Sequence, residues 1–388
     1  MALVVKKNQA WAVEKELTEG TYRAPQSSTS YVQTLAEGAE LSRSKELLER
    51  NIFTSSIGQT APRTGQFSVS GTLPVEARAA AAEGTAPEYD DLMESALGSK
   101  RQLASPVTTG TGNTASILKV TSANTLFAKG DIILIKEPGA FHVSPVKSVT
   151  TTEVELEIPG DSAFSNAVVI AKHTTYVCAD SGHPSLSISR YLENAVVQYA
   201  TGCRVNSLSL ENFSTGQLAN FKFGFEGLNF NSNLGSLPQT PSYDSQVPPI
   251  ILAGMVMMDG VEIDVNELAF SVENTLGFKT SILAENGRVS GRATERKITG
   301  SFNPYMASDT LANFNKFKNN TPFSVFAYAK LPSATPGEFS GIVAIWMPNC
   351  LITELGEADQ DGIMQDSISF SANRGNTGNI PEIYITVI

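Results

Sequence analysis

The chain of 388 residues carries 39 acidic against 28 basic side chains, a net charge of −11, and 41% of its residues are hydrophobic. This length exceeds that of most single domains, so we expect two or three domains, each able to bury a core. The basic residues form no cluster that could hold phosphates, which argues against tight nucleic-acid binding, and no apolar run is long enough to span a bilayer.

The N-terminal residues 1–16 do not resemble a secretory signal, because the apolar stretch is short and charges follow it at once. Synthesis in a cytoplasm is therefore expected. The three cysteines, Cys178, Cys203 and Cys350, have no paired spacing, so they predict small buried core residues rather than a disulfide framework.

A strand followed by a helix is the first predicted unit. The strand-like segment 63–71, "RTGQFSVSG", precedes residues 85–98, "TAPEYDDLMESALG". In the second segment Pro87 and acidic residues lie at the start and Gly98 at the end, which is the usual order of start and stop residues in a helix.

Residues 111–172 differ in their residue pattern, because short β-branched runs alternate with Gly, Pro and Asn. This pattern predicts a small inserted β-barrel or sandwich, which we bound at 105–175 and expect to face solvent. The glycine-rich loop 109–114 lacks the Lys-Ser/Thr pair of a phosphate-binding loop, so it is interpreted as a connection.

The chain contains an internal repeat. The stretch 201–227 resembles the stretch 349–375, and a shift of 147 residues without a gap places Cys203 on Cys350. The match also places one alternating apolar row on another: Phe221, Phe223 and Phe225 on Ile368, Phe370 and Ala372. Alternation with polar or small residues predicts a half-buried strand in each copy.

The second copy repeats the earlier order, with a strand-like segment 298–305, "ITGSFNPY", and a helix over 308–320 capped by Ser308. A Pro- and Ser-rich stretch separates the copies. The predicted domains are a first module (1–104 plus 176–234), the insert (105–175), a linker (235–249) and a second module (250–388). The fold class is mainly β: two tandem β-sandwich or half-barrel modules, each with a flanking α-helix, and a small β domain.

Signatures of catalysis are missing. The histidines, His142, His173 and His183, have no metal-binding or triad-like spacing, and residues 357–362, "EADQDG", fit a hairpin turn better than a calcium loop. We therefore predict no catalytic, cofactor or metal site and no enzyme activity.

The chain resembles the tail tube proteins of long-tailed phages with non-contractile tails (siphoviruses). The resemblance rests on "VEKELTEGTYRAP" from Val13, "ELLERNIF" from Glu46, "APEYDDLMESALG" from Ala86 and "GCRVNSLSLENFSTGQLANFKFGFEG" from Gly202. It implies a virion protein whose modules close six to a ring, with rings stacking into a tube that conducts the genome. Two modules per chain would then give a homotrimeric, pseudo-sixfold ring.

The resemblance also implies partners and a lumen. The partners are further copies of the chain, the tail terminator, the tape measure and the distal tail proteins, with double-stranded DNA passing without tight binding. With four strands per module, roughly 24 strands leave a channel of about 40 Å. The candidate lumen-facing residues are Asn220, Lys222, Glu226, Asp366, Ser367, Ser369 and Ser371.

Three alternatives stay open. A tail terminator or distal tail adaptor would form one ring and stop. A surface β-domain adhesin would use the insert for binding, and a carbohydrate-active enzyme would need a pair of carboxylates that no sequence feature identifies.

Overall fold

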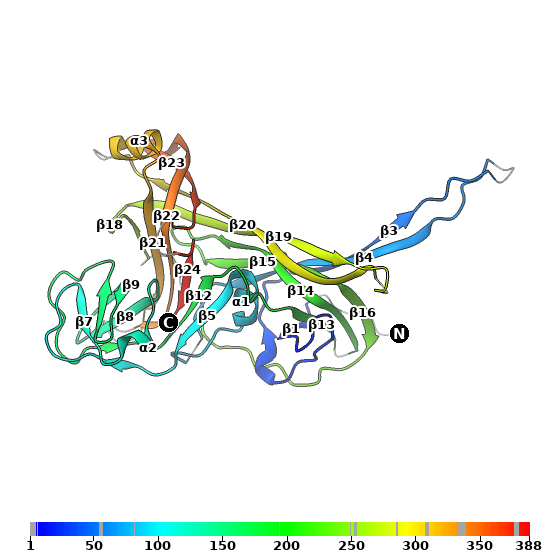
Figure 1. The fold of residues 1–388 in the computed structure, drawn as a ribbon, viewed down its shortest axis with the longest axis horizontal. Coiled ribbons are helices and arrows are strands. Elements are labelled where there is room, and N and C mark those ends of the chain that lie inside the picture. The colour runs from blue at the N-terminus through cyan, green and yellow to red at the C-terminus, as the bar shows by residue number, and fades with distance from the viewer. Residues whose placement is uncertain are drawn as a thin grey trace.

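The computed structural model describes residues 5, 7–53, 57–80, 82–193, 195–248, 250–251, 254–284, 286–306, 310–332, 339–375 and 380–388. The expected helix cap Ser308 and the last linker residue, Pro249, lie outside these ranges. The described strands form one large sheet and one six-stranded sheet, so the prediction of a mainly β protein is confirmed (Figure 1).

The large sheet contains a first set of strands from the N-terminal half of the chain. They are β1 (Gln9–Lys15), β2 (Tyr31–Val32), β3 (Glu40–Leu48), β4 (Arg63–Glu76), β5 (Gly98–Leu103), β12 (His173–Cys178), β13 (Leu186–Leu192), β14 (Val196–Glu211), β15 (Asn220–Gly227) and β16 (Asn229–Leu234). A single 3₁₀ turn, η1 (Ser28–Ser30), precedes β2.

A second set follows in the C-terminal half. It consists of β17 (Met255–Met258), β18 (Val261–Glu262), β19 (Val265–Thr280), β20 (Arg288–Pro304), β21 (Phe323–Pro332), β22 (Phe339–Gln360), β23 (Ile363–Ala372) and β24 (Tyr384–Val387).

The two sets share one pattern of antiparallel pairing. In the first, β1 pairs with β13, β13 with β14, and β14 with both β15 and β16, while β15 continues to β4 and β3. In the second, β17 pairs with β21, β21 with β22, and β22 with both β23 and β24, while β23 continues to β20 and β19. Ladders β14–β19 and β12–β24 join the sets.

Both predicted helices are present. Helix α1 (Asp90–Leu97) ends at Gly98, whose positive φ of 93° suits a residue without a Cβ. Pro87 lies just before the helix, near its first turn. Helix α3 is Thr310–Asn319. The helices differ in burial, because Leu92 of α1 is buried whereas Leu311 of α3 is 66% exposed.

The inserted region has a sheet and a core of its own. It comprises β6 (Val107–Thr108), β7 (Ile117–Lys119), α2 (Ala123–Leu126), β8 (Ile132–Glu137), β9 (Ala140–Val149), β10 (Glu153–Leu156) and β11 (Val169–Ile170). Its core residues include Leu118, Ile133 and Val154.

The insert was expected to face solvent, but one of its faces packs against the second set of strands. Ile132 and Leu134 of β8 join a buried cluster with Trp346 and Tyr384. Gly130 lies so close to Tyr384 that a Cβ would be 2.1 Å from its ring. One face of the insert is therefore fixed to β22 and β24.

Both copies of the repeat form the predicted strands. The cross-strand pairing in the two copies, however, does not agree with the gapless alignment of their sequences. Val205 lies opposite Phe225 in β15, and the corresponding Ile352 lies opposite Phe370 in β23. Phe370 thus occupies the position of Phe225 rather than that of Phe223. The connection between β22 and β23 is the tight turn at Asp361 and Gly362, both with positive φ, and is shorter than the β14–β15 loop.

Candidate functional site: a polar sheet face with two open edges

Eight strands run side by side through both halves of the chain, in the order β3, β4, β15, β14, β19, β20, β23 and β22. Four come from each set. The join is the ladder between Ser207–Leu210 of β14 and Phe270–Glu273 of β19. Backbone pairing therefore continues across the boundary between the sets, as the strands at the centre of Figure 1 show.

One face of this sheet is apolar and covered by the rest of the chain. Phe221, Phe223 and Phe225 are buried, and the ring of Tyr89, the residue before α1, meets Phe221 edge-on with centroids 5.7 Å apart. In the second set, Phe302, Phe323 and Phe370 form a similar group of rings. These aromatic clusters bury the largest side chains of the sheet and fix which face is turned inward.

The opposite face carries six of the seven residues predicted to line a lumen. Lys222 lies opposite Ser209 of β14, and Ser209 lies opposite Ser271 of β19. The same row continues through Thr299 to Ser371 of β23. Because residues directly opposite in a ladder share a face, the structure brings the predicted residues of the two repeats onto one surface. The six are Asn220, Lys222, Glu226, Ser367, Ser369 and Ser371, and all are partly exposed.

Asp366 is the exception. Its side chain is 3% exposed and accepts a hydrogen bond from Asn313 of α3 at 3.0 Å. It shares the face of Ile368 and Phe370, because residues two apart in a strand point to the same side. The sequence prediction grouped Asp366 with Ser367 and so placed it on the wrong face.

The polar face holds acidic residues that the sequence prediction missed. Glu211, Glu273 and Glu354 lie in the same rows on β14, β19 and β22, and Glu211 forms an ion pair with Lys222 at 3.1 Å. The alternation of polar and apolar residues within β14, β19 and β22 points to these glutamates, whereas the sequence prediction considered only the strands that became β15 and β23. Serine, threonine and glutamate dominate the face.

Both sets contain a bulge at the same place. The register shifts between Val205 and Ser207 in β14, and between Ile352 and Glu354 in β22. A bulge adds one residue to a strand and increases its twist. The bulges therefore increase the twist of the sheet just beyond the two matched cysteines, Cys203 and Cys350, both of which are buried.

The eight-strand sheet ends in two open edges within the described part of the chain. At one end, β3 pairs only with β4. At the other end, residues 354–357 of β22 pair only with β23. Beyond the body, β3 and β4 continue as an arm that projects from the molecule (Figure 1). Such edges expose rows of backbone donors and acceptors to any strand that fits them.

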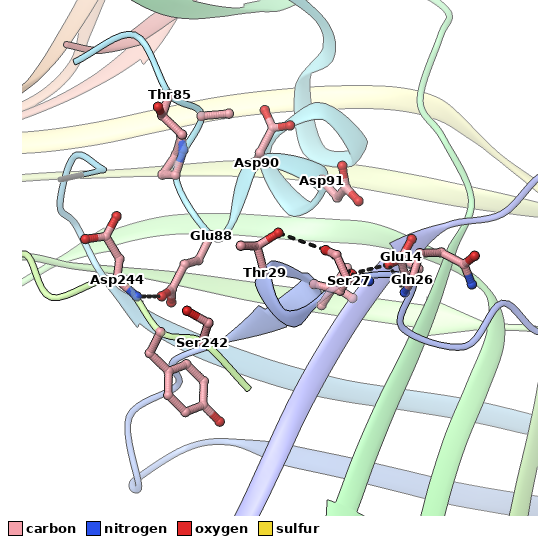
Figure 2. Close-up of a pocket in the computed structure, with 15 residues that line it drawn as sticks. Glu14, Gln26, Ser27, Thr29, Thr85, Glu88, Asp90, Asp91, Ser242 and Asp244 are labelled. Atoms are coloured by element: carbon pink, nitrogen blue, oxygen red, sulfur yellow. Dashed lines mark hydrogen bonds between the residues drawn. The ribbon is translucent and has the colours of Figure 1, made fainter. Parts of the chain in front are cut away.

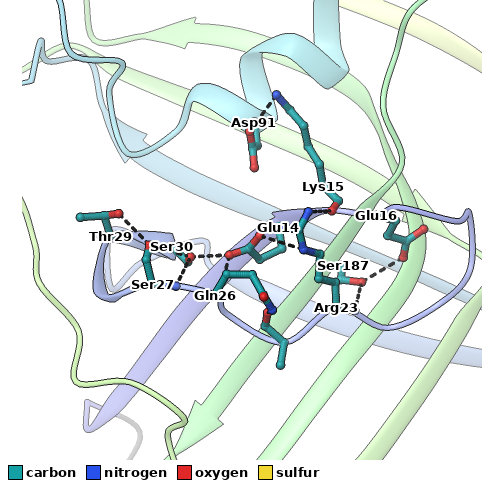
Figure 3. Close-up of polar contacts among 11 residues, drawn as sticks. Glu14, Lys15, Glu16, Arg23, Gln26, Ser27, Thr29, Ser30, Asp91 and Ser187 are labelled. Atoms are coloured by element: carbon teal, nitrogen blue, oxygen red, sulfur yellow. Dashed lines mark hydrogen bonds and ion pairs between the residues drawn. The ribbon is translucent and has the colours of Figure 1, made fainter.

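The N-terminal motif has a structural role. Buried Glu14 accepts hydrogen bonds from the backbone of Gln26 at 2.9 Å and from the hydroxyl of Ser30, and Glu16 accepts from Ser187 at 3.0 Å (Figure 3). These bonds tie the chain after β1 back to β1 and β13. The motif thus orders the segment that leads to the β3–β4 arm.

Lys15 connects the same strand to α1. It bonds Glu94 at 2.7 Å and pairs with Asp91 at 3.1 Å. Burial alone would lower the pKa of Lys15, but its bonds to Glu94 and Asp91 outweigh burial and raise it. Burial raises the pKa of Asp91, and the charge of Lys15 opposes this rise.

A pocket beside α1 is lined by acidic side chains, including Glu14, Glu88, Asp90 and Asp91 (Figure 2). Its carboxylates are held from within the chain: Glu88 accepts from the backbone of Gln33 at 2.9 Å, and Asp90 accepts from Tyr176 at 2.7 Å. Among the described residues, no group of three or more His, Cys, Asp and Glu is placed to bind a metal ion. The pocket is a site of packing and bonding between elements.

Comparison with known proteins identifies the family. A family model described as phage tail tube protein matches residues 7–372, which is nearly the whole chain. The chain belongs to the phage tail tube protein family. No curated protein sequence matches it. Tail tube proteins are structural components of a phage tail rather than enzymes, and no described helix of this tail tube protein could span a membrane.

Proposed function

We propose that three copies of this tail tube protein close into a ring in which each chain supplies two tube modules. The observation that carries the proposal is the continuous eight-strand sheet, with four strands from each set and an open edge at each end. Three such sheets give a closed barrel of 24 strands with pseudo-sixfold symmetry. Closure removes both edges, which is how barrels avoid uncontrolled strand pairing.

The two modules are the two sets of strands with a common pairing pattern. The first module is 1–104 plus 176–234, the insert 105–175 follows β5, the linker is 235–249, and the second module is 250–388. A duplicated chain lets neighbouring modules differ. Only the first carries an insert, so a trimeric ring has three inserts on its outer surface.

The polar face lines the lumen of the ring. Roughly 24 strands at about 4.8 Å spacing, tilted near 45°, give a backbone diameter of about 50 Å and a free channel of about 40 Å. Lys222 pairs with Glu211, and Lys297 lies opposite Glu273, so these lysines are balanced by neighbouring carboxylates. The serine-rich surface, which also carries Glu354, therefore does not attract phosphates strongly. Double-stranded DNA therefore passes through it without a retaining electrostatic attraction.

Rings stack into the tube of a long, non-contractile tail. The β3–β4 arm carries exposed Leu47, Leu48 and Phe53, which suits a contact with the next ring. Assembly occurs after synthesis in the host cytoplasm. The tape measure fills the growing tube, and the tail terminator and distal tail proteins bind its ends.

Electron microscopy of the purified protein over a concentration series tests this function. The expected result is hollow, open-ended tubes that lengthen with concentration. Single closed rings at every concentration would instead favour a tail terminator or distal adaptor, and persistent monomers that bind cell surfaces would favour an adhesin. Either result would remove the tube-forming role.

A further inference from the structure

The join between the two modules provides a template for the join between two chains. In β14, Ser207–Leu210 pair antiparallel with Phe270–Glu273 of β19, so that Ser207 lies opposite Glu273 and Leu210 opposite Phe270. This ladder links the last strand of one four-strand group to the first strand of the next. A ring made of identical groups must repeat a ladder of this kind at each chain boundary.

The first strands of the two groups can be aligned through a pair of glycines. Gly71 of β4 lies opposite Phe225, and Gly300 of β20 lies opposite Phe370. A Cβ at Gly71 would meet the Phe225 ring and the carbonyl of Glu40, and a Cβ at Gly300 would meet the Phe370 ring and the carbonyl of Ala269. Since Gly71 pairs with Leu41 and Gly300 with Phe270, Leu41 of β3 corresponds to Phe270 of β19.

The last strands align through their bulges. The register shift before Ser207 in β14 corresponds to the shift before Glu354 in β22. Counting onward from the bulge, Leu210 of β14 corresponds to Glu357 of β22. The stretch 354–357 lies within residues 351–360 of β22, which among the described residues have ladder partners only in β23.

We infer that residues 354–357 of β22 pair antiparallel with residues 41–44 of β3 from a second copy of this chain, with Glu354 opposite Ser44 and Glu357 opposite Leu41. The inference rests on the proposed ring and adds its register. The ladder has the same length and polarity as the one inside the chain, so the two boundaries of each module are equivalent in backbone geometry.

The side chains at this junction fit one another. On the polar face, Glu354 and Gly356 meet Ser44 and Ser42, which continues the serine-rich rows of the lumen. On the other face, Arg43 lies opposite Leu355 and diagonal to Glu357. Diagonal neighbours of opposite charge attract across a ladder, whereas any slip by one residue would put Arg43 on the lumen side.

Helix α3 adds a second contact at the same boundary. At the internal join, Asn274 of β19 donates a hydrogen bond to the carbonyl of Ala96 in α1 at 2.9 Å. The equivalent position on β3 is Lys45, which the pairing brings beside α3 of the first copy. Among the exposed residues of α3 are Leu311 (66%), Phe314 (48%) and Phe317 (38%). This apolar face, which the isolated chain leaves open, is covered by β3 of the second copy.

Paired cysteines test the register directly. Ser44→Cys with Glu354→Cys places two thiols directly opposite, at a Cβ separation of about 4.5–5.5 Å that suits a disulfide. Ser42→Cys with Glu354→Cys uses the same face one step away, at about 7–8 Å, and is the matched control. All three positions are outside the core, and the native cysteines are buried.

The assembled variants are oxidised and run on a non-reducing gel. We expect covalent dimers and trimers from Ser44→Cys/Glu354→Cys, formed roughly tenfold faster than from the control, with no species above the trimer. Tubes that cross-link equally in both variants, or faster in the control, would overturn the register while leaving the tube function intact. Failure of the unmodified chain to form rings or tubes would overturn the proposed function itself.

Discussion

Gly71 lies directly opposite Phe225, and a Cβ at Gly71 would be 2.4 Å from the Phe225 ring. Gly300 and Phe370 repeat the relationship in the second module, where the distance from such a Cβ to the ring would be 2.3 Å. In each case the missing side chain makes room for a phenylalanine that packs across the strand. The same packing solution thus fixes β4 on β15 and β20 on β23.

Replacing either glycine should destabilise the subunit. Because a methyl group would overlap both a ring and a backbone carbonyl, we expect Gly71→Ala and Gly300→Ala each to lower the free energy of unfolding by about 1–3 kcal/mol. Chemical denaturation of dissociated subunits measures this. Gly356→Ala is the control, since its nearest neighbour is the Cβ of Ser367 at 3.9 Å; an equal loss there would refute the packing explanation.

Charge exchange at the proposed chain boundary should change assembly. Because Arg43 also lies over the Phe230 ring of its own chain at 4.9 Å, the free energy of unfolding of the dissociated subunit is measured for each variant. Arg43→Glu places like charges beside Glu357, so we expect the protein concentration needed for tube formation to rise several-fold. The double variant Arg43→Glu/Glu357→Arg should restore assembly.

Lys129→Glu, an identical charge change on an exposed residue of the insert, is the matched control for this series and should assemble normally. Light scattering against protein concentration gives the comparison. If the double variant assembles no better than Arg43→Glu, the two residues are not neighbours.

The join between the insert and β5 should weaken in acid. Burial lowers the pKa of His173, the nearby charge of Arg101 lowers it further, and Asp131 and the carbonyl of Ala171 oppose this. Because folding depresses the pKa of His173, the contribution of the neutral imidazole to stability is complete above about pH 6.5 and is lost as the pH falls. Proteolysis within residues 105–175 should therefore accelerate below that pH, and less so in His173→Gln. Equal pH dependence in both proteins would exclude His173 as the cause.

The native thiols should stay unreactive until the protein unfolds. Burial raises the pKa of Cys178 to about 12 and raises that of Cys203 well above its usual value. Their stability contribution is complete below about pH 8.5 and falls as the pH rises through that value. A thiol reagent at pH 8 should label no cysteine in the native chain and all three in denaturant. Rapid native labelling would show that these side chains are accessible.

Local patterns were sufficient to predict several elements. The alternation around Phe223 and Phe370 identified two half-buried strands, and the acidic start and Gly98 stop identified α1. Turn residues that recur at short intervals indicated the inserted β region, although its expected end at residue 175 lies inside β12 (His173–Cys178). Each of these features depends on neighbours within about ten residues, so the sequence carries it directly.

Features that depend on distant partners could not be predicted in this way. The tight turn at Gly362 shortens the second hairpin, and a gapless alignment therefore matched Phe370 to the wrong phenylalanine. Asp366 was placed in the lumen because its partner Asn313 lies on a helix far along the chain. The ladder between β14 and β19, which joins the two sets of strands into one sheet, leaves no signature in either strand alone.

Rotational averaging of end-on views of assembled rings distinguishes three chains in a ring from six. We expect a barrel with sixfold appearance at its inner wall and threefold symmetry outside, with three lobes from the three inserts. Six equivalent lobes, which would mean six chains in each ring, or a wall without any threefold component would contradict this arrangement.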